Sequence, residues 1–219
     1  IVRLAVIDTV GLGQQFEPQA GVAILLRPVD TFWDIGLNDE TAVWFIQSMG
    51  NYANCIKYME ASDDGMETWI PRIRQIAADN GWNLRDWIGP HDIKKRGGFT
   101  GDTLWSEIAK MGVKFKVVDK VADKGVSIQK LRTNFSRLRM DKTECAVGIR
   151  HLDNYRYEFD SGNGVWKEKP RHDRASNGAD SLQQWAMYSD KMDHEAALLA
   201  RARPDASVHR GVKRMRGFM

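Results

Sequence analysis

Thr31-Phe-Trp-Asp-Ile-Gly36 has the composition of a short buried strand that ends in a glycine turn. Thr41–Gln47 and Asn54–Glu60 follow after short loops, and both are rich in apolar and aromatic residues. Three strands joined by short loops predict an antiparallel meander. Two later segments, Arg85–His91 and Lys114–Val118, have the length and composition of further strands.

Helical spacing of apolar residues begins after the meander. From Met66 to Ala77 they recur at intervals of three and four residues, and Gly81 is the predicted end of that helix. Asp102–Lys110 is predicted as a second helix, between the fourth and fifth strands. Strand–helix–strand units of this kind close with right-handed crossovers and place their strands in parallel.

The last third of the chain is predicted to be mainly helical. Ser127–Arg139 and Thr143–Tyr155 have helical spacing, Asp160-Ser-Gly-Asn-Gly164 predicts a β-hairpin, and Ser176 is the expected N-cap of a late helix. These elements together describe an α/β, ribonuclease-H-like fold. Its central mixed sheet, an antiparallel meander plus parallel strands, is flanked by helices.

The charge is distributed unevenly along the 219 residues. The whole chain carries a formal net charge of +3, but residues 201–219 hold six basic residues against Asp205 alone, which leaves about −2 on the rest. We therefore expect one domain over residues 1–190, followed at 191–219 by a helical extension and a basic, flexible tail. Such a tail suits an anionic partner, or is simply a solvated terminus.

Composition also limits the cellular setting. No apolar run approaches the ~20 residues of a membrane-spanning helix. The sequence from Ile1 shows no basic n-region or apolar h-region, so no secretory signal is visible, and a start at Ile1 suggests a fragment of a longer polypeptide. Cys55 and Cys145 are expected to be reduced core thiols in a cytosol-like compartment. No Cys-x-x-Cys or His-x-x-x-His pair indicates zinc.

Three aspartates are the candidate catalytic residues. Asp34 and Asp92 each close a predicted strand, and Asp180 lies near the start of the late helix. Each has an ordinary alternative role, as a turn residue or as a helix-dipole partner. Carboxylates that converge at one edge of a sheet repel one another unless a divalent cation neutralises them. Such a cluster is typical of two-metal phosphodiester hydrolysis, with ions about 3.5–4 Å apart.

Several motifs resemble one known family. The segments that carry the resemblance are Trp33-Asp-Ile-Gly36, Asp39-Glu-Thr-Ala-Val-Trp44, Gly89-Pro-His-Asp92, Pro170-Arg-His-Asp173 and Ala175-Ser-Asn-Gly-Ala-Asp180. In order and spacing they resemble the nuclease domain of the large terminase subunit of tailed double-stranded DNA bacteriophages, over roughly residues 30–190. Two departures are Asn177, where the family commonly has His, and Ser181, where Ala is usual.

The resemblance implies an activity and its setting. It implies that Asp34, Asp92 and Asp180 bind two Mg²⁺ or Mn²⁺ and cut concatemeric double-stranded viral DNA during genome packaging. It also implies two protein partners in the intact motor, the phage portal protein and the small terminase subunit, and an ATPase domain that lies N-terminal to the nuclease. The setting would be the host cell cytoplasm. No Gly-x-x-x-x-Gly-Lys-Ser/Thr loop occurs here, so no ATP site is expected in this chain.

Further residues are candidates for supporting roles. Glu60 and Asp173 are candidate additional metal ligands, and His91 and His172 are expected to support the ligands from outside. The candidates for contacts with the DNA backbone are Lys94, Lys95, Arg96, Lys167 and Lys169, all of which could equally be ordinary solvated side chains.

Two alternatives stay open at the level of the sequence. One is another ribonuclease-H-like nuclease, of the resolvase or transposase type. The other is a non-catalytic docking module whose carboxylates are structural and which binds a portal or DNA.

Overall fold

In a computed structural model, which describes residues 4–5, 14–16, 27–36, 40–62, 64–94, 103–121 and 123–202, the predicted meander is present. Its strands β3 (Val29–Asp34), β4 (Thr41–Ser48) and β5 (Ala53–Ala61) pair in antiparallel fashion. Strand β6 (Leu84–Gly89) then pairs in parallel with β3, and β7 (Phe115–Val117) pairs in parallel with β6. The mixed sheet predicted from the sequence is therefore confirmed.

Two strands of this sheet were missed. The segment predicted as a single helix over Ser127–Arg139 divides into α4 (Lys124–Asn134), the 3₁₀ turn η2 (Phe135–Arg137) and β8 (Leu138–Asp141). Strand β8 pairs in parallel with β5 and with β2 (Gln14–Phe16), which gives the order β2-β8-β5-β4-β3-β6-β7 among the described strands. Leu138 continues the helical spacing of the preceding residues, so periodicity alone could not reveal that the chain becomes extended there.

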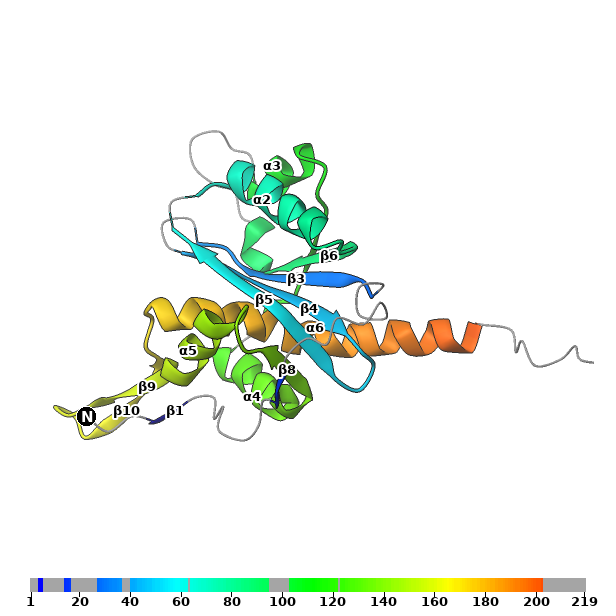
Figure 1. Cartoon of the computed structure of the whole chain (residues 1–219). Coiled ribbons are helices and arrows are strands. Elements are labelled where there is room, and N and C mark those ends of the chain that lie inside the picture. The colour runs from blue at the N-terminus through cyan, green and yellow to red at the C-terminus, as the bar shows by residue number, and fades with distance from the viewer. Residues whose placement is uncertain are drawn as a thin grey trace, which may run out of the picture.

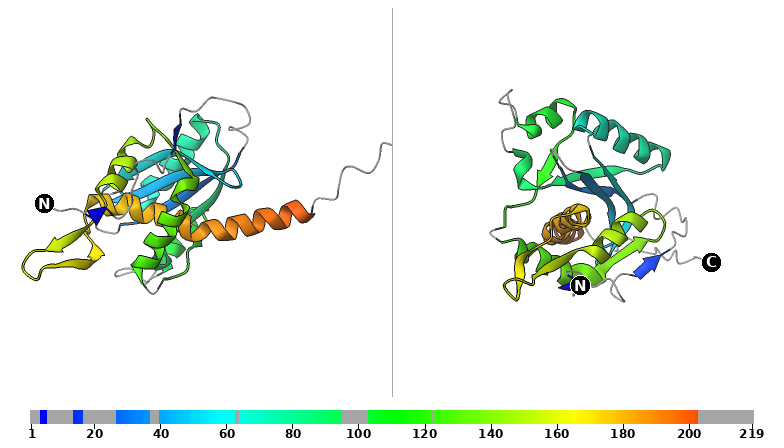
Figure 2. Two further views of the ribbon diagram at one scale, coloured as in Figure 1. Left: turned by 90° about the horizontal axis from the view of Figure 1, so that it is seen from below. Right: turned by 90° about the vertical axis from the view of Figure 1, so that its left-hand side faces the viewer.

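Helices cover both faces of this sheet (Figure 1). On one face lie α2 (Met66–Asp79) and α3 (Leu104–Lys110), and on the other lie α4, α5 (Ala146–Asn154) and α6 (Arg174–Ala202). The view along α6 shows the three layers most clearly (Figure 2). No helix within the described residues combines the length and apolar composition needed to cross a lipid bilayer.

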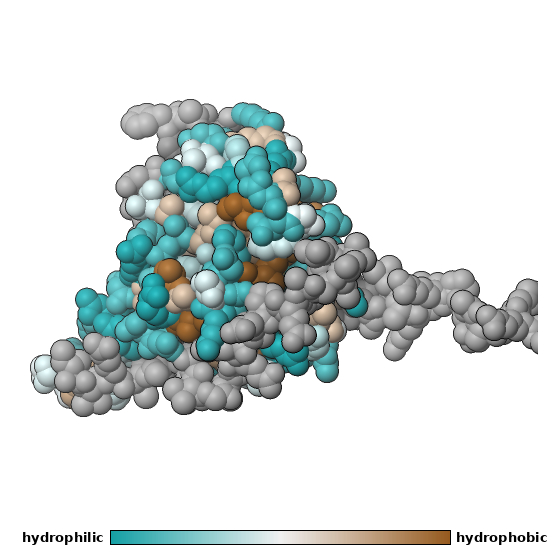
Figure 3. Space-filling view, in the orientation of Figure 1, coloured by the Kyte–Doolittle hydropathy of each residue, from teal (hydrophilic) through white to brown (hydrophobic). Residues whose placement is uncertain are grey.

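Alternation along the strands divides the core in two. Trp33, Val43 and Phe45 face α2 and α3, whereas Phe32 and Trp44 face α6. All are fully buried. The face of the molecule seen in Figure 3 is largely hydrophilic, as expected when the apolar side chains lie between the layers.

The start of α6 differs from the prediction. The helix begins at Arg174, because the Asp173 carboxylate accepts a hydrogen bond from the Ala175 amide at 3.1 Å. Ser176, the predicted N-cap, instead lies in the first turn and donates its hydroxyl to the Asp173 carbonyl at 2.7 Å. The helix then continues without interruption to Ala202, across the boundary proposed at residue 190. The tail at 203–219 lies outside the described residues.

The predicted hairpin is confirmed. Strands β9 (Arg156–Asp160) and β10 (Val165–Pro170) pair in antiparallel fashion, and β1 (Leu4–Ala5) pairs with β9 to complete a small second sheet. Asp160 accepts hydrogen bonds from the amides of Gly162 and Asn163, and Gly164 takes a positive φ of 68°. The hairpin projects from the body near the start of α6 (Figure 1).

A glycine allows α5 to approach the sheet closely. A Cβ atom on Gly148 would lie 2.5 Å from a Trp44 ring carbon and 2.7 Å from Cγ of Tyr58. We expect Gly148→Ala to lower the free energy of unfolding by about 1–3 kcal/mol, since two buried aromatic rings would have to shift. Chemical denaturation measures this change. Val147→Ala, at an exposed neighbouring position, is the control, and equal stability of both variants would contradict the close packing described here.

Candidate functional site

Asp34 and Glu60 lie on the same face of the meander. Asp34 is directly opposite Ala42 in β4, and Ala42 is directly opposite Glu60 in β5. Directly opposed residues in neighbouring strands share a face. The next pair on this face is Phe32 and Trp44, which are also directly opposed and pack towards α6. Both carboxylates therefore belong to the α6 side of the sheet.

Asp92 reaches the same edge from the neighbouring strand. Phe32 in β3 is directly opposite Ile88 in β6, and these two strands run in the same direction. Asp34 is the last residue of β3, and Asp92 follows the end of β6 in the 3₁₀ turn η1 (His91–Lys94). The carboxyl ends of parallel strands meet at one edge, so both aspartates stand there. Asp92 is exposed.

Asp180 comes to this region on α6. The indole Nε1 of Trp44 donates to the Gly178 carbonyl at 2.8 Å, which fixes the second turn of α6 over the meander. A Cβ on Gly178 would lie 3.0 Å from the Tyr58 hydroxyl oxygen. Burial raises the pKa of Tyr58, and the hydrogen bond to Glu60 and the charges of Glu60, Glu40 and Asp34 raise it further. Tyr58 thus links the acidic end of the meander with the part of α6 that carries Asp180.

The carboxylate of Asp180 is held by three side chains. Lys124 Nζ lies 2.7 Å from Oδ2, Gln183 Nε2 donates to Oδ1 at 2.9 Å, and the Tyr155 hydroxyl lies 3.5 Å from Oδ1. Burial raises the pKa of Asp180, while Lys124, Gln183 and the nearby His172 act in the opposite direction. Lys124 was not predicted from the sequence, because 56 residues separate it from Asp180 and no local motif marks the pair.

Glu60 is the centre of a second network. Its Oε2 accepts a hydrogen bond from the Tyr58 hydroxyl at 2.7 Å and lies 2.7 Å from His151 Nε2. Its Oε1 lies 2.7 Å from Arg174 Nη2, and Arg174 also reaches Glu40 at 3.0 Å. With a side chain only 7% exposed, Glu60 is engaged on both oxygens. Its role as a metal ligand, one of the predictions from the sequence, would require these contacts to rearrange.

Glu60→Gln therefore separates a structural role from a ligand role. We expect it to lower the free energy of unfolding by about 1–3 kcal/mol, because Arg174 and His151 lose a largely buried charged partner. Chemical denaturation without metal measures this change. If Glu60 is structural, metal affinity changes little, whereas loss of metal binding with unchanged stability would identify Glu60 as a ligand.

The motif residues before α6 are engaged in local contacts. Besides capping the helix, the carboxylate of Asp173 lies 3.3 Å from Arg171 Nε and 3.7 Å from Arg156 Nη1. His172 Nδ1 is 3.0 Å from the hydroxyl of Ser176. A ligand role for Asp173 stays a prediction, as do the supporting roles of His172 and of His91, which is half-buried at the start of η1.

The two departures from the family pattern are buried in the packing of α6. Asn177 is 2% exposed and Ser181 is fully buried. The Ser181 hydroxyl donates to the Asn177 carbonyl at 2.9 Å and lies 3.0 Å from the Gly178 carbonyl. Ser181 is therefore satisfied within the helix itself.

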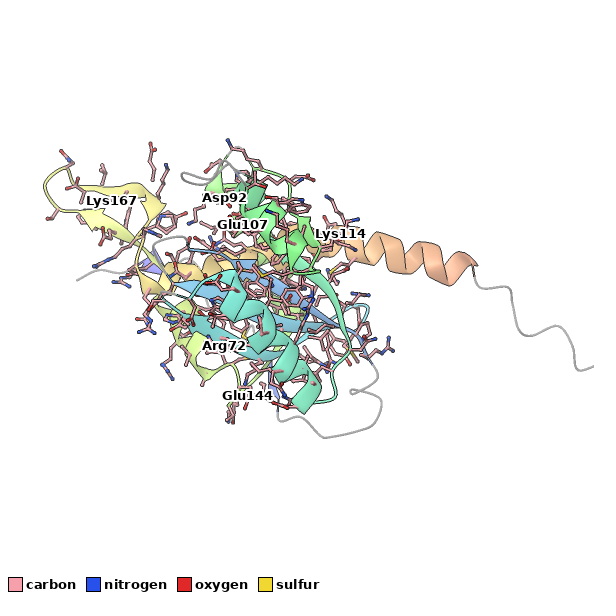
Figure 4. All side chains as sticks on the ribbon, turned by 90° about the horizontal axis from the view of Figure 1, so that it is seen from above. Arg72, Asp92, Glu107, Lys114, Glu144 and Lys167 are labelled. Atoms are coloured by element: carbon pink, nitrogen blue, oxygen red, sulfur yellow. The ribbon has the colours of Figure 1, made fainter. Side chains whose placement is uncertain are left out.

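Three of the five candidate DNA contacts are described. Lys94 Nζ lies 5.1 Å from the centre of the Trp105 ring, and Lys167 pairs with Glu158 at 2.8 Å, which raises the pKa of Lys167. Lys167 and Lys169 line an open cavity of about 720 Å³ along β10 that also includes His172. In Figure 4, Lys167 lies on the projecting hairpin and Asp92 lies on the body of the protein. Lys95 and Arg96 lie outside the described residues.

The donor chemistry of the site fits a hard divalent cation. Asp34, Asp92 and Asp180 offer carboxylate oxygens, the ligands that Mg²⁺ and Mn²⁺ favour. Among the described side chains, no group of three or more His, Cys, Asp or Glu is already arranged to hold a metal ion. The fold thus brings the aspartates to one region without closing them around a common point.

Comparison with known proteins identifies the fold. Neither a protein-family model nor a curated protein matches the sequence. The large terminase of a thermophilic bacteriophage, in complex with ADP, matches 84% of this chain with a TM-score of 0.60 and 12% identity. The nuclease domain of the large terminase of bacteriophage SPP1, with bound Mn, matches 83% with a TM-score of 0.54 and 13% identity. The large terminase nuclease of thermophilic phage G20c, with bound magnesium, matches 80% with a TM-score of 0.51 and 14% identity.

The extent of these matches differs. The match covers 98% of the SPP1 nuclease domain and 84% of the G20c nuclease, but only 44% of the ADP-bound large terminase. At such low identity the likeness establishes the fold. This chain has the ribonuclease-H-like fold of large terminase nuclease domains, as its sequence predicts.

Proposed function

We propose that this chain is the metal-dependent endonuclease domain of a phage terminase large subunit, which cleaves concatemeric double-stranded DNA during genome packaging. The observation that carries the proposal is the placement of Asp34, Asp92 and Asp180. They come from two parallel strand ends and from α6, in the fold of nuclease domains that have been crystallised with manganese or magnesium.

Each part of the site has a task under this proposal. Asp34, Asp92 and Asp180 would hold two Mg²⁺ or Mn²⁺. When bound, the ions supply activation of the attacking water and neutralisation of the charge that develops on the phosphodiester. Gln183 orients Asp180 through its 2.9 Å hydrogen bond, and the hydroxyl of Tyr58, in β5, lies close to Gly178 of α6.

Basic side chains near the site would position the DNA. Lys94 follows Asp92 in η1, and Lys167 and Lys169 line the cavity that reaches His172. Lysine contacts with phosphates fix the register of a duplex but carry no sequence information. We therefore propose cleavage with little preference for base sequence, with Lys95 and Arg96 as further candidate contacts.

The intact protein would be larger than this chain. The thermophilic-phage large terminase of which this chain matches 44% has been crystallised with ADP and with ATP-γ-S. By analogy, an ATPase domain would precede the nuclease, and the portal protein and small terminase subunit would be partners in the host cell cytoplasm.

Closed circular DNA tests the proposed activity directly. An endonuclease converts supercoiled plasmid to nicked and linear forms, whereas an exonuclease has no end to attack. We expect this conversion in Mn²⁺, with products of many lengths on further digestion. A non-catalytic docking module would retard the plasmid in a gel and leave it intact, and a resolvase-type enzyme would cut branched substrates far faster than the plasmid.

A further inference from the structure

One lysine occupies an unusual position beside the candidate metal ligands. Lys124 is the first residue of α4, where the positive end of the helix dipole disfavours a cation. Its Nζ nevertheless lies 2.7 Å from Asp180 Oδ2, in a pair whose two side chains are 37% and 18% exposed. The contact with Asp180 accounts for a placement that the helix itself does not favour.

The same end of α4 also orients Asp180 through a second residue. The Ser127 hydroxyl donates to Gln183 Oε1, which turns the amide of Gln183 so that its Nε2 donates to Asp180 Oδ1. Gln183 therefore occupies one carboxylate oxygen, and Lys124 occupies the other. A divalent cation that binds Asp180 through Oδ2 has to share or replace the contact made by the ammonium group.

We infer that Lys124 is an internal counter-cation of Asp180 that competes with the divalent metal and so sets the metal concentration at which the site fills. Resting on the proposed function, the inference assigns Lys124 as a positioning residue. Two cations at one carboxylate repel each other, so the metal binds at the expense of the Lys124 pair. Removal of the ammonium charge should strengthen metal binding.

The structure offers a matched control on the same two helices. Lys130, also in α4, pairs with Asp190, ten residues after Asp180 in α6. That spacing corresponds to about 15 Å along the helix. Lys130→Met removes the same charge from the same helix pair away from the candidate ligands.

Manganese binding tests the inference without any measurement of activity. Free Mn²⁺ is measured by electron paramagnetic resonance at about pH 8.5, where protons compete little for carboxylates. We expect Lys124→Met and Lys124→Gln to lower the Mn²⁺ dissociation constant roughly three- to tenfold. Lys124→Gln retains a hydrogen-bond donor if Lys124→Met fails to fold. Lys124→Arg and Lys130→Met should match the unmodified protein.

The other outcomes identify which claim is wrong. If Asp180→Asn abolishes Mn²⁺ binding but neither uncharged Lys124 variant binds more tightly, the metal centre stands and the competition by Lys124 is overturned. If Lys130→Met tightens binding as much as Lys124→Met, the effect is one of general charge, which also overturns it. If the unmodified protein binds no Mn²⁺, or Asp180→Asn binds it equally well, the proposed metal centre fails and this inference with it.

Discussion

Asp34→Asn, Asp92→Asn and Asp180→Asn are each expected to reduce DNA cleavage by about a thousandfold or more. Asparagine keeps the size of the side chain but removes the negative charge that a divalent cation requires. The loss should appear in the initial rate of plasmid nicking at saturating Mn²⁺. Because Asp34 and Asp92 stand at strand ends, their substitution should leave the melting temperature nearly unchanged.

Asp190→Asn is the control for this series. Asp190 lies on the same helix as Asp180 and also pairs with a lysine of α4, yet the proposal gives it no part in catalysis. We expect this variant to cleave at the rate of the unmodified protein. Cleavage within a few-fold of normal in all three site variants would exclude Asp34, Asp92 and Asp180 as the catalytic set.

Cleavage is also expected to depend completely on a divalent cation. EDTA should abolish nicking, and Mn²⁺ or Mg²⁺ in excess should restore it, because the aspartates alone provide no group that activates water or neutralises the phosphodiester. Ca²⁺ should bind and yet support little turnover, since its larger and more flexible coordination shell misplaces the reacting groups.

The control for metal removal is a measurement that the protein remains folded. Circular dichroism should be the same in EDTA and in Mn²⁺, because the core between the layers is built mainly from apolar side chains, which need no metal to pack. Nicking that continues undiminished in EDTA would contradict the two-metal proposal, and loss of the native spectrum would show that the metal is needed for folding.

The sequence predicted the parts of the fold in which local pattern and tertiary structure agree. The strands of the meander are apolar and are separated by short loops, and the period changes clearly at Met66. Strand β8 was missed because Leu138 satisfies both the helical spacing before it and the alternation with Met140 inside the strand. Pairing with β5, a long-range contact, determines the outcome there.

The candidate site also combines residues that local sequence indicates with contacts that only the folded chain reveals. Asp34, Asp92 and Asp180 could be proposed from the sequence because each lies at or near the end or the start of a recognisable element, and because the motifs around them resemble those of a known family. The partners of Asp180 and Glu60 could not be predicted from the sequence. Lys124, in α4, contacts Asp180, and His151, in α5, contacts Glu60, and both contacts form only in the folded chain. Arg174 could have been noticed in the sequence, since it directly follows the motif that ends in Asp173. Its contacts with Glu40 and Glu60 nevertheless depend on where α6 begins.

Crystals soaked in Mn²⁺ and measured at the manganese absorption edge test the central claim most directly. Anomalous scattering locates the ion independently of any assay, and Asp34, Asp92 and Asp180 come from three separate elements. The proposal predicts anomalous peaks between these three carboxylates, with Asp180 drawn away from Lys124. Peaks elsewhere on the protein, or an Asp180 that keeps its 2.7 Å contact with Lys124 and binds no ion at saturating Mn²⁺, would contradict it.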